Sequence, residues 1–364
     1  MAAAKILTIQ KPQYVKALLH HYLAKLFAGK PDRPIDAKAP VINHALILYP
    51  DHLGDHLQSS TALWRLRDAY PGASLVFAGR LVPDDAFLRK SLPYDTILGL
   101  SPDQLDQGVK DYIDHYRPDA IIYLRGRGDH TGIMWHAQRA AVPVRAGGGE
   151  KGQGALLTHP YYPQQWQAVT LYQNAILDQL LGVSTQAPAT PVWPDGRLPQ
   201  PKHIAKILIS PFSQHVFRWP MQHWDRLLDM LKPLGMSIAV VGSGKNYEEA
   251  EKWLERHPTV SNLCGKTTLE ELFAAMRAAR LHITLCTGTR HVAVATGTPS
   301  VAIGHGSDAE EVIGKYSATE TYLRASVPCS PCGYSSCPYG HYHCLTQTTP
   351  EYVFGQVKAR LLEV

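Results

Sequence analysis

Near residue 290 the chain reads Leu285-Cys286-Thr287-Gly288-Thr289-Arg290-His291, and a Val/Ala-rich segment then runs to a stop at Gly297-Thr298-Pro299. This order predicts a buried strand over 282–285 and a turn at Thr287-Gly288 that opens a helix. The first N–H groups of a helix lack partners within it, and threonine hydroxyls beside them make a pocket suited to phosphate. Arg290 and His291 can add cationic donors to such a pocket. The stretch therefore predicts a phosphate-binding helix start in an α/β fold.

The composition is that of a globular enzyme with two domains. The chain has 364 residues, 45% hydrophobic and 18% charged, which is enough to bury two cores of ordinary domain size. Its formal net charge of +5 favours anionic partners, such as nucleotide diphosphates or an acidic membrane face. No nucleic-acid recognition motif accompanies this charge, so we expect no nucleic-acid partner. The chain lacks a bilayer-spanning apolar run and a signal-peptide pattern, which predicts a cytoplasmic protein.

The first 40 residues have a pattern of their own. Apolar residues recur at three- and four-residue spacing over 11–27, with Lys and His on the opposite face, and a Pro- and charge-rich linker follows to Pro40. This predicts a basic amphipathic helix and a linker over 1–40. Such a helix can make a peripheral contact with an anionic membrane or pack on the protein's own body, and the pattern fits both.

Strand and helix signals then alternate. The apolar run Ala45-Leu46-Ile47-Leu48-Tyr49 predicts a strand buried on both faces of a parallel sheet. Pro50-Asp51-His52-Leu53-Gly54-Asp55 predicts a turn into a helix over 59–70, and a second strand follows, which makes a βαβ unit. Residues 41–187 thus form the predicted N-terminal domain, a doubly wound sheet that binds its ligand at the carboxyl ends of the strands.

The second half repeats the pattern. A Pro-rich stretch over 188–201 predicts a hinge. Lys206-Ile207-Leu208-Ile209-Ser210 then restarts the alternation, which gives a second predicted domain over 202–364. The predicted fold class is α/β, with two Rossmann-like doubly wound domains facing a central cleft.

Four motifs follow one another along the chain: Leu53-Gly54-Asp55, Arg218-Trp219-Pro220, Leu263-Cys264-Gly265-Lys266-Thr267-Thr268-Leu269, and Cys286-Thr287-Gly288-Thr289-Arg290-His291. In this order they resemble motifs of the ADP-heptose:lipopolysaccharide heptosyltransferase family, which is glycosyltransferase family 9 and has the GT-B fold. The resemblance extends from about residue 45 to the C-terminus. It departs at Phe217, where the family has a phosphate-binding Lys, and at Cys286, where the family has Asp.

The resemblance implies transfer of a sugar from a nucleotide diphosphate to an acceptor hydroxyl, with Asp55 as the catalytic base. The alternative role of Asp55 is that of a helix cap. Cations and helix dipoles would stabilise the departing diphosphate in the second domain, which is the nucleotide-sugar-binding one. The candidate donor-binding residues are Ser210, Ser213, His215, Arg218, Lys266, Thr267, Thr287, Gly288 and His291.

Three residues have a structural alternative. Arg218 can be a surface residue stacked on Trp219, and His291 can be a satisfied core histidine. Cys286 cannot replace a carboxylate that accepts hydrogen bonds from a sugar. We interpret it as a small packed side chain.

A cysteine-rich loop lies over 329–344, with thiols at Cys329, Cys332, Cys337 and Cys344. Because cytoplasmic thiols stay reduced, this spacing favours a structural zinc or iron site. The alternative is a set of reduced or partly disulfide-paired thiols in a loop rich in Gly, Pro and Tyr. Some family members, including relatives that glycosylate autotransporter adhesins, carry a C-terminal cysteine cluster that binds iron, and the resemblance implies the same here. We expect no catalytic metal.

The hypothesis is therefore an inverting glycosyltransferase that moves a sugar, heptose from ADP-heptose, to a lipopolysaccharide-type envelope acceptor. A second hypothesis keeps the fold and makes the acceptor a protein, as in autotransporter heptosylation. A third is a non-catalytic binding or scaffold protein, in which Phe217 and Cys286 mark the loss of donor chemistry.

Overall fold

The computed structural model describes residues 39–48, 52–79, 85–101, 103–124, 131–163, 167–184, 190, 198–213, 217–307, 310–314 and 317–363. The predicted helix over 11–27, most of the predicted hinge over 188–201, and His215 lie outside these residues.

The first sheet has six parallel strands, in the order β3 (Thr96–Gly99), β2 (Ser74–Gly79), β1 (His44–Leu48), β4 (Ala120–Tyr123), β5 (Val144–Gly148) and β6 (His159–Tyr161). In its centre, Ala45 of β1 lies opposite Leu75 on one side and Ala120 on the other. Every residue of β1 after His44 is buried, as expected for a strand covered on both faces. The helices of this half of the chain are α2 (Leu53–Ala69), α3 (Asp85–Ser91), α4 (Leu105–Tyr116), α5 (Thr131–Arg139), η1 (Glu150–Leu156) and α6 (Val169–Leu181).

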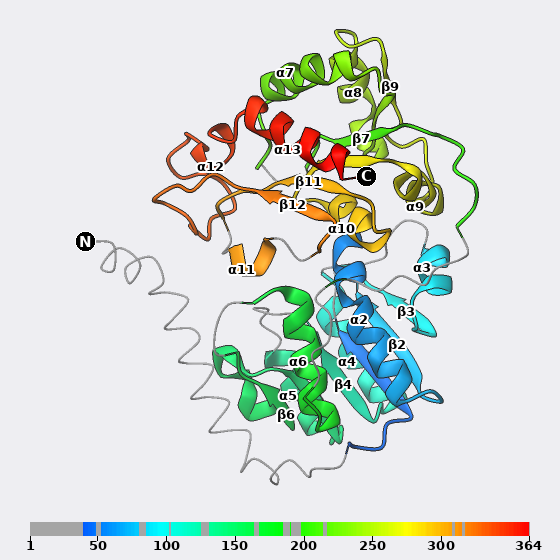
Figure 1. Cartoon of the computed structure of the whole chain (residues 1–364). Helices are drawn as coiled ribbons and strands as arrows, with labels where there is room; N and C mark the ends of the chain where they lie inside the picture. Colours follow the sequence, from blue (N-terminus) through cyan, green and yellow to red (C-terminus); the bar gives the residue numbers. More distant parts are fainter. Residues whose placement is uncertain are drawn as a thin grey trace. The chain divides into compact units, whose positions relative to one another are not determined.

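The second sheet has the same construction, in the order β12 (Glu320–Leu323), β11 (Ser300–Ile303), β10 (Leu281–Leu285), β7 (Ile207–Ser210), β8 (Ile238–Val240) and β9 (Val260–Asn262). All of its strand pairs are parallel. Its helices are α7 (Met221–Leu231), η2 (Lys232–Leu234), η3 (Gly244–Asn246), α8 (Tyr247–Leu254), α9 (Leu269–Ala278), α10 (Gly288–Ala295), α11 (Glu310–Ile313), α12 (His343–Thr346) and α13 (Pro350–Leu362) (Figure 1). Two parallel sheets of this order confirm the predicted α/β class.

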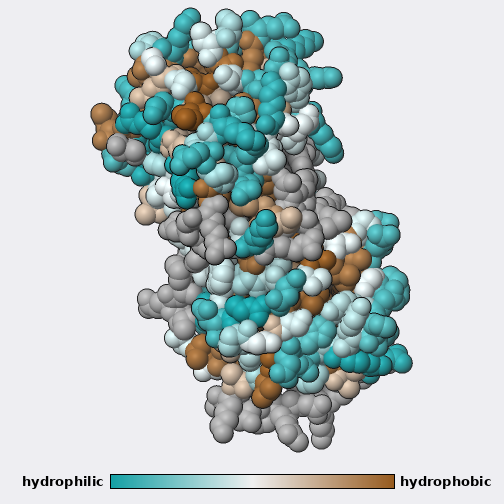
Figure 2. All heavy atoms as spheres, turned by 90° about the vertical axis from the view of Figure 1, so that its right-hand side faces the viewer, coloured by the Kyte–Doolittle hydropathy of each residue, from teal (hydrophilic) through white to brown (hydrophobic). Residues whose placement is uncertain are grey.

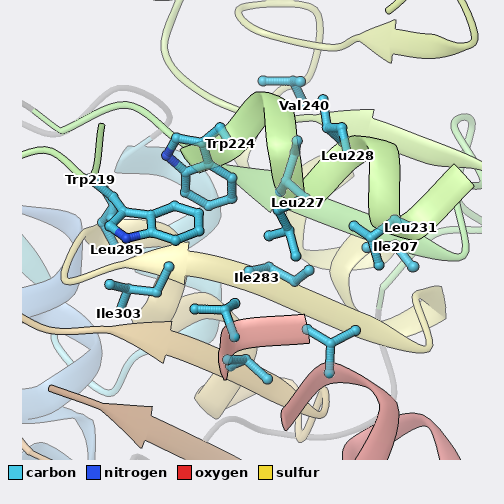
Figure 3. Packing of buried hydrophobic residues seen from close by; sticks show 14 of the residues in the cluster. Ile207, Trp219, Trp224, Leu227, Leu228, Leu231, Val240, Ile283, Leu285 and Ile303 are labelled. Atoms are coloured by element: carbon cyan, nitrogen blue, oxygen red, sulfur yellow. The ribbon is translucent and has the colours of Figure 1, made fainter. Parts of the chain in front are cut away.

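Two tryptophans fill the core between the second sheet and α7. Trp219 and Trp224 are fully buried, with ring centroids 5.0 Å apart and nearly perpendicular planes (88°). The indole N–H of Trp219 donates to the carbonyl of Thr348 at 2.8 Å, at the residue before the N-cap of α13. The Trp219 ring lies beside Leu285 and Ile303, which come from the ends of β10 and β11, and Trp224 lies on the other side of Trp219 in the same cluster (Figure 3). The Trp of the Arg-Trp-Pro motif is therefore a core residue.

The described residues form two compact units. Two short segments belong to the second unit although their neighbours in the sequence belong to the first. The first unit contains 39–48, 59–79 and 92–184, and the second contains 52–58, 85–91 and the residues from 190 onward. Leu57 of α2 is buried in an apolar cluster of the second unit, and Phe87 of α3 meets Phe273 of α9 with ring centroids 5.2 Å apart. The first turns of α2 therefore pack with the second sheet.

The surface of the described residues is largely polar. On the face shown in Figure 2, hydrophilic side chains cover most of the described surface and hydrophobic ones gather in small patches. Among the described helices, none is both long and apolar enough to cross a membrane.

Buried histidines predict a stability that depends on pH. Burial lowers the pKa of His282 in β10 to about 3 and that of His56 in α2 to about 4. In the unfolded chain both pKa values are near 6.5. Between pH 6.5 and 4 the unfolded chain therefore binds more protons, so the free energy of unfolding falls as the pH falls. Each group contributes about 1.4 kcal/mol per pH unit in this interval.

Thermal unfolding at pH 7, 6 and 5 measures this effect. The melting temperature should fall at each step. His282→Gln, which keeps an amide able to bond the Ser210 hydroxyl, should give a shallower decline, because one titrating group has been removed. A variant with the same pH dependence as the wild type would contradict the assignment to His282.

Candidate functional site

Helix α10 begins at the carboxyl end of β10, where three threonine hydroxyls converge. Thr287 is the N-cap residue and has an extended backbone (φ −135°, ψ 173°). Its Oγ1 lies 2.9 Å from that of Thr289 and 3.4 Å from that of Thr284. The first N–H groups of a helix have no partners within it, so this end of α10 presents N–H and O–H donors together. The arrangement can bind a phosphate group.

The Leu53-Gly54-Asp55 motif packs directly on this helix start. A Cβ atom at Gly54 would lie 2.4 Å from Cδ2 of His291, far inside contact distance. A Cβ atom at Gly288 would lie 3.7 Å from that of Leu53, which is ordinary contact. Both segments belong to the second unit. The structure thus brings together two motifs that lie far apart in the sequence.

Asp55 lies in the first turn of α2, because the helix begins at Leu53 and not near Ser59, where the sequence predicted it. Its Oδ2 accepts the backbone N–H of His52 at 3.0 Å, which satisfies a donor at the helix start and explains the earlier beginning. The carboxylate is half-buried. Asp55 therefore caps the helix, and its catalytic role stays a prediction.

His291 is a neutral side chain. Burial, together with a smaller effect of the charge of Arg290, lowers its pKa to about 3. The prediction that His291 adds a cation was therefore wrong. A neutral imidazole can still donate one hydrogen bond to a ligand, so its candidate role in donor binding is that of a neutral donor.

Arg290 is committed inside the fold, so the prediction that it donates to phosphate was also wrong. Its side chain is 2% exposed, and its Nε and Nη2 bond both carboxylate oxygens of Glu320 at 2.6 and 2.8 Å. The remaining N–H groups donate to the carbonyls of Ile313 and Gly314 and to Sγ of Cys286, at 2.6, 2.7 and 3.4 Å. A buried guanidinium needs such full pairing because an unpaired charge is costly. Arg290 thus joins α10 to β12 and to the end of α11.

Cys286 occupies the pocket between these groups. Its thiol lies 3.9 Å from the hydroxyl of Tyr322, whose ring faces the guanidinium of Arg290 with 4.8 Å to the ring centroid. Burial raises the pKa of Cys286, so the group is a protonated thiol at neutral pH. This environment suits the interpretation of Cys286 as a packed side chain.

The candidate donor-binding residues at the end of β7 and after it interact with other groups of the protein. The hydroxyl of Ser210 lies 2.9 Å from Nε2 of His282, so it joins β7 to β10. Arg218 donates from Nε to the carbonyl of Ser213 at 3.1 Å, and its Nη1 pairs with Glu249 at 2.8 Å. Its guanidinium is partly exposed and lies near the ring of Phe212, 6.0 Å from the centroid, whereas Trp219 is buried. Arg218 therefore stays accessible to a ligand.

Lys266 and Thr267 follow β9 at the same end of the sheet. The exposed Lys266 ammonium lies 4.8 Å from the ring centroid of Tyr247, a cation–π arrangement. Thr268, the next residue, is the N-cap of α9 and forms a capping box with Glu271. Thr267 is half-buried directly before this cap.

The four cysteines of the 329–344 loop line one small cavity, together with Phe217, Gly306 and His341. Cys344 is buried, and its pKa is raised by burial and by the neighbouring thiols. Burial alone would raise the pKa of the Cys337 thiol, but backbone hydrogen bonds to the thiol outweigh this effect. The pKa of Cys337 is therefore lowered. All four thiols are free. The cavity thus gathers groups that can bind zinc or iron, although the described residues contain no cluster of three or more His, Cys, Asp or Glu already arranged around a metal position.

Sequence reasoning missed several residues of this site. Glu320 and Tyr322 surround Arg290 from β12, and Glu249 pairs with Arg218 from α8. No local pattern marks these residues, because their partners are distant in the sequence.

The two parallel six-stranded sheets have the GT-B architecture of solved heptosyltransferase structures. The model of glycosyltransferase family 9 (heptosyltransferase) matches residues 137–343, which is more than half of the chain. The chain belongs to this family. No curated protein matches the sequence.

Solved structures share the fold at low identity. The ADP-heptose LPS heptosyltransferase II of E. coli is 20% identical, with a TM-score of 0.64 over 88% of this chain and 99% of that one. A family 9 glycosyltransferase of Veillonella parvula is 19% identical, with a TM-score of 0.68 over 92% and 100%. TibC, an iron-containing dodecameric glycosyltransferase of enterotoxigenic E. coli, is 16% identical, with a TM-score of 0.58 over 90% and 78%. These likenesses confirm the predicted GT-B fold.

The contact at Gly54 predicts a sharp steric effect. Gly54→Ala should force His291 or α2 to shift and lower the free energy of unfolding by about 1–3 kcal/mol, as overpacking does. Gly132→Ala is the matched control, because Gly132 is also the second residue of a helix and a Cβ atom there meets nothing within 4 Å. The control should be neutral or slightly stabilising. Equal unfolding free energies for both variants would refute the close packing on His291.

Proposed function

We propose that this enzyme is an inverting heptosyltransferase that transfers heptose from ADP-heptose to a lipopolysaccharide-type acceptor. The observation that carries the proposal is the packing of Leu53-Gly54-Asp55 on the start of α10. It places a carboxylate in the same unit as a helix start suited to phosphate. The fold likeness to a protein described as ADP-heptose LPS heptosyltransferase II supports the choice of donor and acceptor.

In the proposed mechanism, the acceptor oxygen attacks the anomeric carbon of the heptose while the bond from that carbon to the diphosphate oxygen breaks. Asp55 takes the proton of the acceptor hydroxyl, and the bonding electrons leave with ADP. The N–H groups and hydroxyls at Thr287 and Gly288 stabilise the negative charge on the departing diphosphate. Arg218 and Lys266 supply positive charge at the same end of the sheet.

A protein acceptor is the second candidate. The cysteine cavity supports it, because the relatives that glycosylate autotransporter adhesins also carry a C-terminal cysteine cluster. TibC, which has the same fold, is described as an iron-containing heptosyltransferase. We assign acceptor binding to the N-terminal domain in both cases. The reaction is placed in the cytoplasm, where the residues 11–27 can make a peripheral contact with the inner membrane face.

A panel of nucleotides screened by thermal shift tests donor binding. ADP should raise the melting temperature more than GDP, UDP or AMP, because a ligand that binds only the folded state stabilises it in proportion to its affinity. Equal or absent shifts for all four would overturn the donor assignment. Intact partner binding with no nucleotide shift would select the non-catalytic scaffold.

Asp55→Asn separates catalysis from capping. The Asn side chain keeps an oxygen that can accept the His52 N–H, so the helix cap remains, but it cannot take a proton. Release of ADP in the presence of acceptor should fall by about 10²–10⁴. Asp68→Asn, an exposed substitution in the same helix, should leave the rate unchanged. If Asp55→Asn keeps more than a tenth of wild-type turnover, Asp55 is not the base.

We further propose that Cys329, Cys332, Cys337 and Cys344 hold one structural zinc or iron ion. Their common cavity supports this, because four thiolates suit a tetrahedral site of either metal. The 329–344 loop has few apolar side chains to hold it together, so the bound ion would keep it closed.

Elemental analysis of protein purified without chelators should find about one zinc or iron per chain. The double variant Cys329→Ser/Cys332→Ser should lose the ion and melt at a lower temperature, because metal binding is coupled to folding. Cys264→Ala lies outside the loop and should keep the ion. Metal-free protein with full activity would exclude the site.

A further inference from the structure

The residues that follow β10 and β11 meet at the carboxyl end of the second sheet. Strand β11 pairs with β10 on one side and with β12 on the other, and all three strands are parallel. Cys286 follows β10 and Gly304 follows β11, at the edge where open α/β sheets bind ligands. Cys286 also directly precedes Thr287, the N-cap of α10. This edge therefore includes the helix start described above.

The hydroxyl of Tyr322 reaches this edge from β12. Its oxygen lies 3.9 Å from Sγ of Cys286, so the side chain extends from β12 across β11 to the end of β10. Gly304 leaves the room that the hydroxyl needs, because a Cβ atom at position 304 would overlap the Tyr322 oxygen. The hydroxyl thus lies against bare backbone at the end of β11, beside the residue that precedes α10.

The ring of Tyr322 has a fixed support. It faces the guanidinium of Arg290, with 4.8 Å from the guanidinium carbon to the ring centroid. The guanidinium is itself held by both carboxylate oxygens of Glu320. Because the ring is already in place, a ligand that bonds the hydroxyl pays little to order this side chain.

The hydrogen bonds around Cys286 leave the proton of the Tyr322 hydroxyl available. A guanidinium can only donate, so Nη1 of Arg290 donates to Sγ of Cys286 at 3.4 Å. The thiol in turn donates to the Tyr322 oxygen. Among the described residues, no acceptor takes the proton of that hydroxyl. Burial raises the pKa of Tyr322, so the group keeps its proton at neutral pH and can donate it to a ligand.

The surroundings of this hydroxyl suit an uncharged partner. Cys286 is a protonated thiol, Gly304 has no side chain, and the charge of Arg290 is paired with Glu320. A phosphate gains more from the N–H groups at the start of α10, where the helix dipole is positive. A single neutral O–H donor suits a sugar hydroxyl. Cys286 and Tyr322 are half-buried, so this corner is open to solvent.

We propose that Tyr322 is a specificity-determining residue of the donor site, whose hydroxyl donates a hydrogen bond to a hydroxyl of the transferred sugar. The inference rests on the proposed function, in which the start of α10 binds the diphosphate. A sugar joined to that diphosphate lies within reach of Tyr322, because Cys286 is both the neighbour of the phenol oxygen and the residue before the N-cap. Tyr322 then reads the sugar, and the helix start holds the phosphates.

Tyr322→Phe removes the hydroxyl and keeps the ring on Arg290. Calorimetric titration with ADP-heptose and with ADP separates the sugar from the nucleotide. The variant should bind ADP-heptose about three- to tenfold more weakly than the wild type, the effect of one neutral hydrogen bond, and should bind ADP equally well. Its melting temperature should be unchanged, because a thiol is a weak hydrogen-bond donor. Tyr352→Phe, which removes the hydroxyl of an exposed tyrosine in α13, is the matched control and should change neither affinity.

Each outcome decides the inference. If wild type and Tyr322→Phe bind ADP-heptose equally tightly, the hydroxyl does not contact the sugar, and this inference alone is removed. If the variant weakens ADP and ADP-heptose by the same factor, or if its melting temperature falls, Tyr322 acts through the fold and the inference is wrong. If the wild type binds neither ADP-heptose nor ADP, the proposed function fails as well.

Discussion

The close approach of the α2 backbone to the His291 ring is the constraint on which the site depends. No side chain fits at Gly54, because a Cβ atom would overlap the imidazole at 2.4 Å. The same contact packs the His291 ring against α2, and it brings the Asp55 carboxylate into the unit that carries the helix start proposed to bind phosphate. One glycine thus links the proposed base to the proposed donor site.

Two further networks hold parts of the second unit together. Arg290 ties α10 to Glu320 and to the end of α11, so that a buried charge joins three elements. The cysteine-rich loop holds the segment after β11 through backbone hydrogen bonds to Gly306 and Ser307. The loop thus supports the segment that follows β11 at the carboxyl end of the second sheet.

The sequence predicted the elements well and the pairings poorly. Continuous apolar runs such as 45–48 and 207–209 mark buried parallel strands, because both faces of such strands are covered. The start of α2 was predicted near residue 59, six residues too late. The helix begins at Leu53, because the hydrogen bond from the His52 N–H to Asp55 caps it there. The ion pair of Arg290 depends on a partner thirty residues away, and the stack of Phe217 on His305 depends on the strand order, so neither leaves a local signal.

Mass spectrometry of the reaction product tests whether this enzyme transfers heptose from ADP-heptose to the acceptor. The enzyme is incubated with ADP-heptose and a heptose-deficient lipopolysaccharide acceptor, and both the acceptor mass and the free ADP are measured. The acceptor should gain the mass of one heptose for each ADP released. An unchanged acceptor in the presence of bound ADP-heptose, or a gain from another nucleotide sugar alone, would contradict it.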